Sequence, residues 1–204
     1  MRFGQTYNKT GVNPPHATFN LYGGTYNHTD TSGTKGTRMG YLGSKGDGQK
    51  TLDRACDATL NMFGGNYNEI ELVHMGCNAS TSRLNLHGGV LKAENIILDT
   101  STSTSYCFFS GGSAYIYWNG GTYAPVICID LTAADGIPVE YCGFSADAEG
   151  SPDDISLWDW LIDAFDAREN EEGILIARVP LPDGTALRIE TSDIRVRLSL
   201  LPAE

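Results

Sequence analysis

The sequence has few charged residues, no long apolar segment and no recurrent cysteine motif. Only 19% of its 204 residues are Asp, Glu, Lys or Arg, whereas 24 are glycine, a composition unlike that of an ordinary helical enzyme. No run of about 18 apolar residues is present, so no transmembrane helix is expected. Residues 1–15 lack the apolar core of a secretory signal peptide, which indicates either an intracellular protein or a mature or excised fragment. We favour the fragment, because a repeat starts almost at once.

The charges are unevenly distributed. Residues 147–204 hold 14 acidic and 5 basic side chains, which is −9 of the net charge of −11, and they contain no lysine. An acidic surface repels nucleic acid and anionic membranes. We therefore expect no binding to nucleic acid and none to anionic membrane surfaces. Because no long apolar run is present, we also expect no membrane insertion. We interpret the acidic tail as a solvated, solubilising surface.

The cysteines are irregularly spaced, with no C-x-x-C motif and no neighbouring histidine pair. This spacing gives no support to a zinc site, and we expect no metal or cofactor. Free thiols buried in the core are the simplest interpretation. One disulfide is the alternative, and the sequence does not choose its partners from the five residues Cys56, Cys77, Cys107, Cys128 and Cys142.

A repeat runs through the first two thirds of the chain. Four segments align on a Gly-Gly pair, and they are residues 17–27, 58–68, 82–92 and 114–124. In each segment, apolar residues lie four and two positions before the first glycine and alternate with other residues. This alternation predicts a β-strand with one buried face. A further apolar or aromatic residue two positions after the second glycine predicts a second strand.

The glycine pair predicts a sharp corner between these strands, because glycine accepts positive φ without a Cβ clash. Strand–corner–strand units with variable connections are typical of a solenoid. Stacked units lie about 4.8 Å apart, and Asn20, Asn61 and Asn85 are expected to form a ladder through their amides. We predict a mainly β protein whose residues 1–150 form a parallel β-solenoid, in the form of a right-handed β-helix.

The pattern changes beyond the repeats. Ser151-Pro-Asp-Asp154 is typical of a helix start, with an N-cap serine, a proline and first-turn acids, and the predicted helix ends near residues 170–173. Three strands are expected, over residues 173–181, 185–191 and 194–200. Asp183-Gly184 is the hairpin signal between the first two. Residues 151–204 are predicted to form a small α+β cap that seals the open end of the repeats.

The pattern x-Leu-Asn-Leu-x-Gly-Gly-Thr-x-Asn resembles the repeats of bacterial autotransporter-like and related surface β-solenoid proteins. The resemblance covers about residues 17–130. It implies an extracellular or cell-surface location and a structural role for the repeat, with no catalytic residues to carry over. It implies a non-enzymatic structural or adhesion module that displays loops or binds a glycan or another surface protein.

Aromatic side chains near the glycine corners are the candidate binding surface. An exposed stripe of tyrosine and phenylalanine could stack on sugar rings or dock a partner. Cross-strand aromatic pairs that only stabilise the ladder are the alternative interpretation. The residues of the candidate surface are Tyr22, Phe63, Tyr115 and Tyr117.

A carbohydrate-active enzyme is the alternative function, because parallel β-helices include polysaccharide lyases and hydrolases. Such sites need paired carboxylates, or calcium-binding acids beside an arginine or lysine. Glu69 and Glu71 share one face of a predicted strand, about 7 Å apart by two residues of rise. No second acidic pair falls at an equivalent repeat position, and the four histidines are scattered. The sequence therefore favours a non-enzymatic module.

Overall fold

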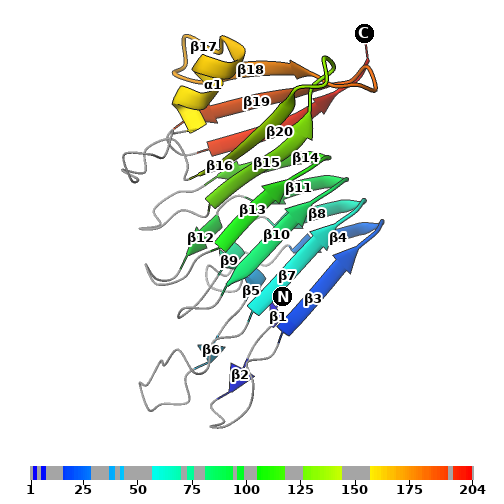
Figure 1. Ribbon diagram of the computed structural model, residues 1–204. Helices are drawn as coiled ribbons and strands as arrows, with labels where there is room; N and C mark the ends of the chain where they lie inside the picture. Colours follow the sequence, from blue (N-terminus) through cyan, green and yellow to red (C-terminus); the bar gives the residue numbers. More distant parts are fainter. Residues whose placement is uncertain are drawn as a thin grey trace.

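The computed structural model of the chain is mainly β, with the short helix α1 (Leu157–Phe165) near one end (Figure 1). No helix among the described residues is long and apolar enough to cross a membrane. The structure describes residues 2–3, 6–7, 16–28, 37–39, 42–43, 57–69, 73–75, 81–93, 96–98, 105–117, 126–143, 157–192 and 195–203.

A parallel-rich sheet of six strands forms one layer of the fold (Figure 1). In spatial order, its strands are β3 (His16–Leu21), β7 (Asp57–Met62), β10 (Ser82–Leu86), β13 (Ser105–Phe109), β15 (Val126–Thr132) and β16 (Pro138–Gly143). The first five strands are parallel, and β16 runs antiparallel to β15.

The second layer is an antiparallel-rich sheet of eight strands. In spatial order, its strands are β4 (Thr25–His28), β8 (Asn66–Glu69), β11 (Val90–Ala93), β14 (Ser113–Tyr117), β20 (Arg195–Leu201), β19 (Ala186–Ser192), β18 (Leu175–Pro180) and β17 (Arg168–Glu169). The first four strands are parallel, and every pairing from β14 to β17 is antiparallel.

Two smaller parallel sheets complete the described strands. A four-stranded sheet contains β1 (Arg2–Phe3), β5 (Thr37–Met39), β9 (Val73–Met75) and β12 (Ile96–Leu98), and a two-stranded sheet contains β2 (Thr6–Tyr7) and β6 (Leu42–Gly43). Val73 and Ile96 are fully buried, so the four-stranded sheet covers part of the same core.

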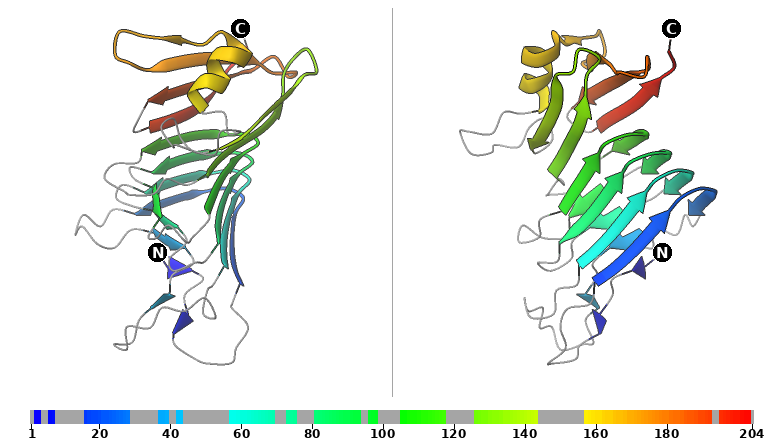
Figure 2. Two further views of the ribbon diagram at one scale, coloured as in Figure 1. Left: turned by 60° about the vertical axis from the view of Figure 1, so that its left-hand side comes forward. Right: turned by 45° about the vertical axis from the view of Figure 1, so that its right-hand side comes forward.

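A strand of the six-stranded sheet, a Gly-Gly turn and a strand of the eight-stranded sheet together form one unit, which we call a rung. The right-hand view of Figure 2 shows the rungs stacked side by side. The second glycine of each turn has a φ between 78° and 83°, which explains the need for glycine there. The rungs are rung 1 (residues 16–28), rung 2 (57–69), rung 3 (82–93) and rung 4 (105–117).

The predicted parallel β-solenoid is wrong, because both large sheets are mixed and neither closes. The reason lies in β15. Continuing the register that pairs Phe109 with Ile129, Leu131 and Thr132 occupy the positions of the glycine pair. Without glycine the chain does not turn the corner. It runs on into an antiparallel hairpin with β16, in which Ala133 N donates to Ile137 O at 2.9 Å.

The fourth repeat was predicted in the wrong register. The sequence alignment used residues 114–124, with the glycines at 120–121, which lie outside the described residues. In the structure, Gly111 and Gly112 make the fourth turn, and β14 follows them as the second strand of rung 4. The glycine pairs of rungs 2, 3 and 4 are therefore 24 and 23 residues apart along the sequence.

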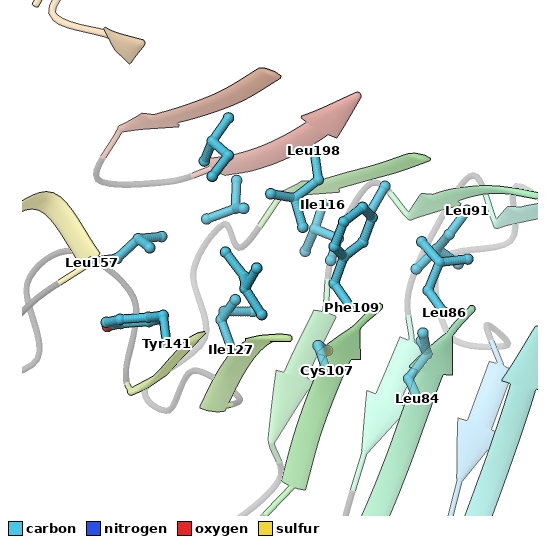
Figure 3. Packing of buried hydrophobic residues seen from close by; sticks show 14 of the residues in the cluster. Leu84, Leu86, Leu91, Cys107, Phe109, Ile116, Ile127, Tyr141, Leu157 and Leu198 are labelled. Carbon is cyan, nitrogen blue, oxygen red and sulfur yellow. The ribbon is translucent and has the colours of Figure 1, made fainter. Parts of the chain in front are cut away.

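The core lies between the sheets, and the inward side chains of successive rungs stack on one another (Figure 3). Leu60, Leu84 and Cys107 are register partners along one buried row. All three are at most 5% exposed. Each rung is thus the packing surface of the next, as the sequence alternation predicted.

The C-terminal strands match the sequence closely, whereas the predicted helix start at residues 151–154 lies outside the described residues. β18, β19 and β20 fall within a residue or two of the predicted strands, and the predicted turn forms, with Leu181 N donating to Thr185 O at 2.9 Å. The helix ends at Phe165, earlier than predicted, because Asp166 adopts a left-handed φ of 47°, a common helix terminator. The helix packs on β18 and β16 through the buried Leu157 and Leu161.

Candidate functional site

An exposed row of rings runs across the glycine turns of the first three rungs. The residue before each glycine pair points outward, because its predecessor points into the core. The rings of Tyr22 and Phe63 stack with centroids 5.0 Å apart, and those of Phe63 and His87 with centroids 5.1 Å apart. Tyr22 is 72% exposed and Phe63 is 46% exposed. A continuous aromatic edge is thus presented to solvent.

A row of amides lies beside the rings, two positions earlier in each rung. Asn61 Nδ2 donates to Asn20 Oδ1 at 2.8 Å, and Asn85 Nδ2 donates to Asn61 Oδ1 at 2.8 Å. The predicted asparagine ladder is confirmed. Both hydrogen bonds run in the same direction, each rung donating toward the one before it.

The two rows together form one surface, which we call the aromatic–amide face. At the rung 4 end Phe108 takes the asparagine position, and its ring lies 6.2 Å from that of His87. Ser110 there takes the ring position, with Oγ 2.6 Å from His87 Nδ1. The residues of the aromatic–amide face are Asn20, Tyr22, Asn61, Phe63, Asn85 and His87.

The structure separates the four residues predicted to bind. Tyr22 and Phe63 are adjacent, but Tyr115 lies on β14 in the eight-stranded sheet, with Arg197 4.7 Å and Lys92 5.7 Å from its ring centre. A hydrogen bond from Arg197 lowers the pKa of Tyr115.

Tyr117 ends β14, and its side chain lies outside the described residues. His87 also belongs to the aromatic row, although it was not among the residues predicted to bind. The signal was present, because His87 occupies the repeat position of Tyr22 and Phe63.

Glu69 holds two rungs and a neighbouring sheet together instead of facing solvent. Its side chain is fully buried. Thr37 donates to Glu69 Oε2 from its backbone N at 3.0 Å and from its hydroxyl at 2.7 Å. His28 Nδ1 lies 2.7 Å from Oε1. The carboxylate thereby links β8 to β4 and β5.

The surroundings of Glu69 are equally enclosed. The Tyr67 hydroxyl lies 2.6 Å from Thr37 Oγ1, and burial raises the pKa of Tyr67. The predicted acidic partner, Glu71, lies outside the described residues. No group of three or more His, Cys, Asp or Glu side chains that could hold a metal ion occurs within the described part of the chain.

A hollow of about 250 Å³ lies between α1 and the β15–β16 hairpin, with Ile137, Trp160 and Phe165 in its lining. Pockets for small ligands usually measure about 300–1,000 Å³, so this hollow is small for such a site. Trp160 packs against Tyr141 and Phe165, with ring centroids 5.1 Å away in both cases. The hollow therefore belongs to the packing of the helix on the sheet.

Both interpretations of the cysteines hold in part. Cys128 and Cys142 form a disulfide between register partners of β15 and β16, whereas Cys107 is a buried free thiol. The disulfide joins the two strands where the six-stranded sheet changes from parallel to antiparallel. Cys56 and Cys77 lie outside the described residues.

We expect Cys107 to be inert to thiol reagents until the chain unfolds. Burial raises the pKa of its thiol from 9.0 to about 12, and only the thiolate is nucleophilic. In a variant with Cys56 and Cys77 replaced by serine, a chromogenic disulfide reagent at pH 8 should react slowly with the native chain and rapidly in denaturant. Equally rapid reaction in both conditions would contradict the burial of Cys107.

The same pKa shift gives a pH dependence. Because the folded pKa exceeds the unfolded one, the stability that Cys107 contributes is complete below pH 9 and is lost as the pH rises toward about 12.

Comparison with known proteins finds no relative of this chain. No protein-family model, no curated protein and no solved structure matches it.

Proposed function

We propose that the chain is a non-enzymatic binding module that holds a glycan chain against its aromatic–amide face. The observation that carries this proposal is the exposed row of stacked rings lying beside a row of hydrogen-bonded amides. Tyr22 and Phe63 are unusually exposed for large aromatic side chains. An exposed aromatic surface is a mark of binding sites.

The chemistry of the face suits a sugar polymer. The edges of the stacked rings form an apolar strip on which the C–H groups of a sugar can pack, and an asparagine amide both donates and accepts hydrogen bonds, as sugar hydroxyls require. The rungs repeat these groups at about the strand spacing of 4.8 Å. A polymer can therefore make several equivalent contacts, each of which increases the effective concentration of the next.

The burial of Glu69 favours a binding module over an enzyme. General acid–base catalysis needs a carboxyl group within reach of the substrate, and Glu69 is fully enclosed by His28, Thr37 and the sheet. The disulfide between Cys128 and Cys142 supports the proposed extracellular or cell-surface location, because such bonds persist in oxidising compartments.

The test is binding of the purified chain to a panel of soluble neutral and acidic polysaccharides, measured by affinity electrophoresis and titration calorimetry. An aromatic pair contributes about 0.5–1.5 kcal/mol beyond its buried area, and we take the same range for each ring–sugar contact. Replacing both Tyr22 and Phe63 by alanine should therefore weaken binding of the best ligand about tenfold. The thermal unfolding midpoint of each variant shows whether the fold is retained.

Tyr115→Ala is the matched control, because this aromatic residue lies on the other sheet. It should leave the affinity unchanged. Equal loss in the control and in the double variant would place binding elsewhere. The same samples are also assayed for the release of new reducing ends. Release that Glu69→Gln abolishes, in a chain that still folds, would show that the protein is an enzyme and would overturn the proposal.

A further inference from the structure

We propose that the free edge of rung 1 docks a strand–glycine–strand segment of the same repeat type, supplied by another polypeptide. Among the described strands, β3 pairs only with β7, and β4 pairs only with β8. In Figure 2, β3 and β4 are the outermost strands of the two large sheets, and β1 lies beside β3. Four independent features of this edge match what one further rung would provide, and none of them depends on the proposed glycan binding.

Gly23 is the first feature. In the later rungs, a Cβ on the first glycine would lie 2.5–2.6 Å from a carbonyl oxygen of the preceding rung, as between Gly64 and Tyr22 or between Gly88 and Phe63. At Gly23 no described atom lies within 4 Å of that position, and its φ is not in the positive region. The described structure therefore does not require glycine here, whereas a preceding rung at the usual spacing does.

The backbone donors of the turn are the second feature. Phe63 N donates to Leu21 O at 2.8 Å, and His87 N donates to Met62 O at 2.8 Å. Each rung thus donates from this position to the rung before it. The equivalent N–H of Tyr22 faces the free edge, where the described residues offer it no acceptor. An unpaired strand edge is a template for pairing with another chain.

The side-chain amides are the third feature. Asn61 donates to Asn20, and in the other sheet Asn68 donates to Asn27 Oδ1 at 2.7 Å. Both ladders end at rung 1, with the Nδ2 groups of Asn20 and Asn27 directed to the free edge by the same geometry. A docked rung carrying asparagine at the same positions would extend both ladders.

Incomplete burial of the apolar row is the fourth feature. The inward side chains of rung 1 are only partly buried, whereas their register partners in rung 2 are fully buried. The rung 1 residues are Phe19, Leu21 and Tyr26, and their rung 2 partners are Leu60, Met62 and Tyr67. A docked segment with apolar residues at these positions would complete the core at this end.

The direction of the backbone N–H donors indicates which kind of segment fits the free edge of rung 1. A second copy that approached through its own rung 1 would bring the same donors, including Tyr22 N, and would leave them unpaired. The edge instead needs the acceptor side of a rung. Within this chain, that side of rung 4 is already covered by β15 and β20. The matching partner is therefore a β-augmenting segment with alternating apolar residues and asparagine around a Gly-Gly pair.

The test uses a fluorescent synthetic peptide with the sequence of residues 57–69 and the full-length chain. Fluorescence anisotropy should show saturable binding. Gly23→Ala should weaken this binding at least about tenfold, because the new Cβ would overlap a carbonyl oxygen of the peptide. The same substitution should leave the thermal unfolding midpoint unchanged, whereas Gly64→Ala, inside the stack, should lower it.

Two controls make the outcome decisive. Arg168→Ala alters β17, the edge strand at the far end of the eight-stranded sheet, and should leave peptide binding unchanged. A peptide with both glycines replaced by alanine should not bind. Absence of binding by the natural peptide, or binding unaffected by Gly23→Ala, overturns the proposal. Sedimentation of the chain alone as a dimer that Gly23→Ala dissociates identifies a second copy as the occupant of this edge and also overturns the proposal.

Discussion

Removal of residues 151–204 is expected to make the chain aggregate or lose its β-sheet signal. β20 pairs along β14, and Leu200 N donates to Ser113 Oγ at 3.1 Å. Val196 and Leu198 are buried against the last rung. Without them, β14 presents an unpaired edge and a bare apolar row, which together favour edge-to-edge association. The acidic face of this segment would also no longer oppose association.

Size-exclusion chromatography and far-ultraviolet circular dichroism measure this effect. A chain shortened only by residues 202–204, which follow β20, is the matched control and should elute at the same volume as the full-length chain. A chain ending at residue 150 that does not aggregate and that unfolds at the same temperature as the full-length chain would show that the tail is an independent domain and that the predicted cap role is wrong.

Leu84→Ala is expected to lower the free energy of unfolding by about 2–5 kcal/mol, the usual range for truncating a buried leucine. Leu84 is 1% exposed and lies between Leu60 and Cys107 in the stacked row. Because rungs on both sides pack against it, the resulting cavity cannot readily collapse. Urea unfolding followed by tryptophan fluorescence measures the change.

Leu200→Ala is the matched control for this prediction. Leu200 lies on β20 and is 38% exposed, so the same chemical change should cost less than about 1 kcal/mol, because partly exposed side chains lose less burial on truncation. A loss below about 0.5 kcal/mol at Leu84 would mean that the assigned register is wrong.

The sequence predicted well those features that depend only on the local alternation of apolar residues with other residues. A period of two around a glycine pair identified the strands of rungs 1 to 3. It also identified Asn20, Asn61 and Asn85 as a ladder, because identical residues at one repeat position must meet when parallel strands pair in register. The glycine turns followed from the backbone freedom of glycine alone.

The fourth rung was missed because its strand departs from the pattern. After its glycine pair rung 4 has Ser113-Ala114, whereas residues 114–124 repeat the Thr-Tyr of rung 1 at Thr122-Tyr123. This error also misplaced part of the candidate site. In the true register, Tyr115 pairs with Lys92 and belongs to the outward face of the eight-stranded sheet, away from Tyr22 and Phe63.

The mixed, open sheets could not be read from the repeat, because they depend on pairings between distant segments. The missing glycines at Leu131 and Thr132 signal that the chain runs straight past the corner. Nothing local indicates that β20 returns to pair with β14, some 80 residues earlier in the sequence. The burial of Glu69 is equally non-local, since it depends on Thr37 reaching the carboxylate from another sheet.

Hydrogen–deuterium exchange measured by mass spectrometry, with the tightest-binding polysaccharide of the panel present and absent, tests the central claim most directly. We predict that bound glycan protects peptides from residues 16–28, 57–69 and 81–93, which carry the aromatic–amide face. Peptides from residues 157–192 should exchange at the same rate in both samples. Protection confined to residues 157–192, or no protection anywhere under saturating polysaccharide, would contradict the assignment of this face as the binding site.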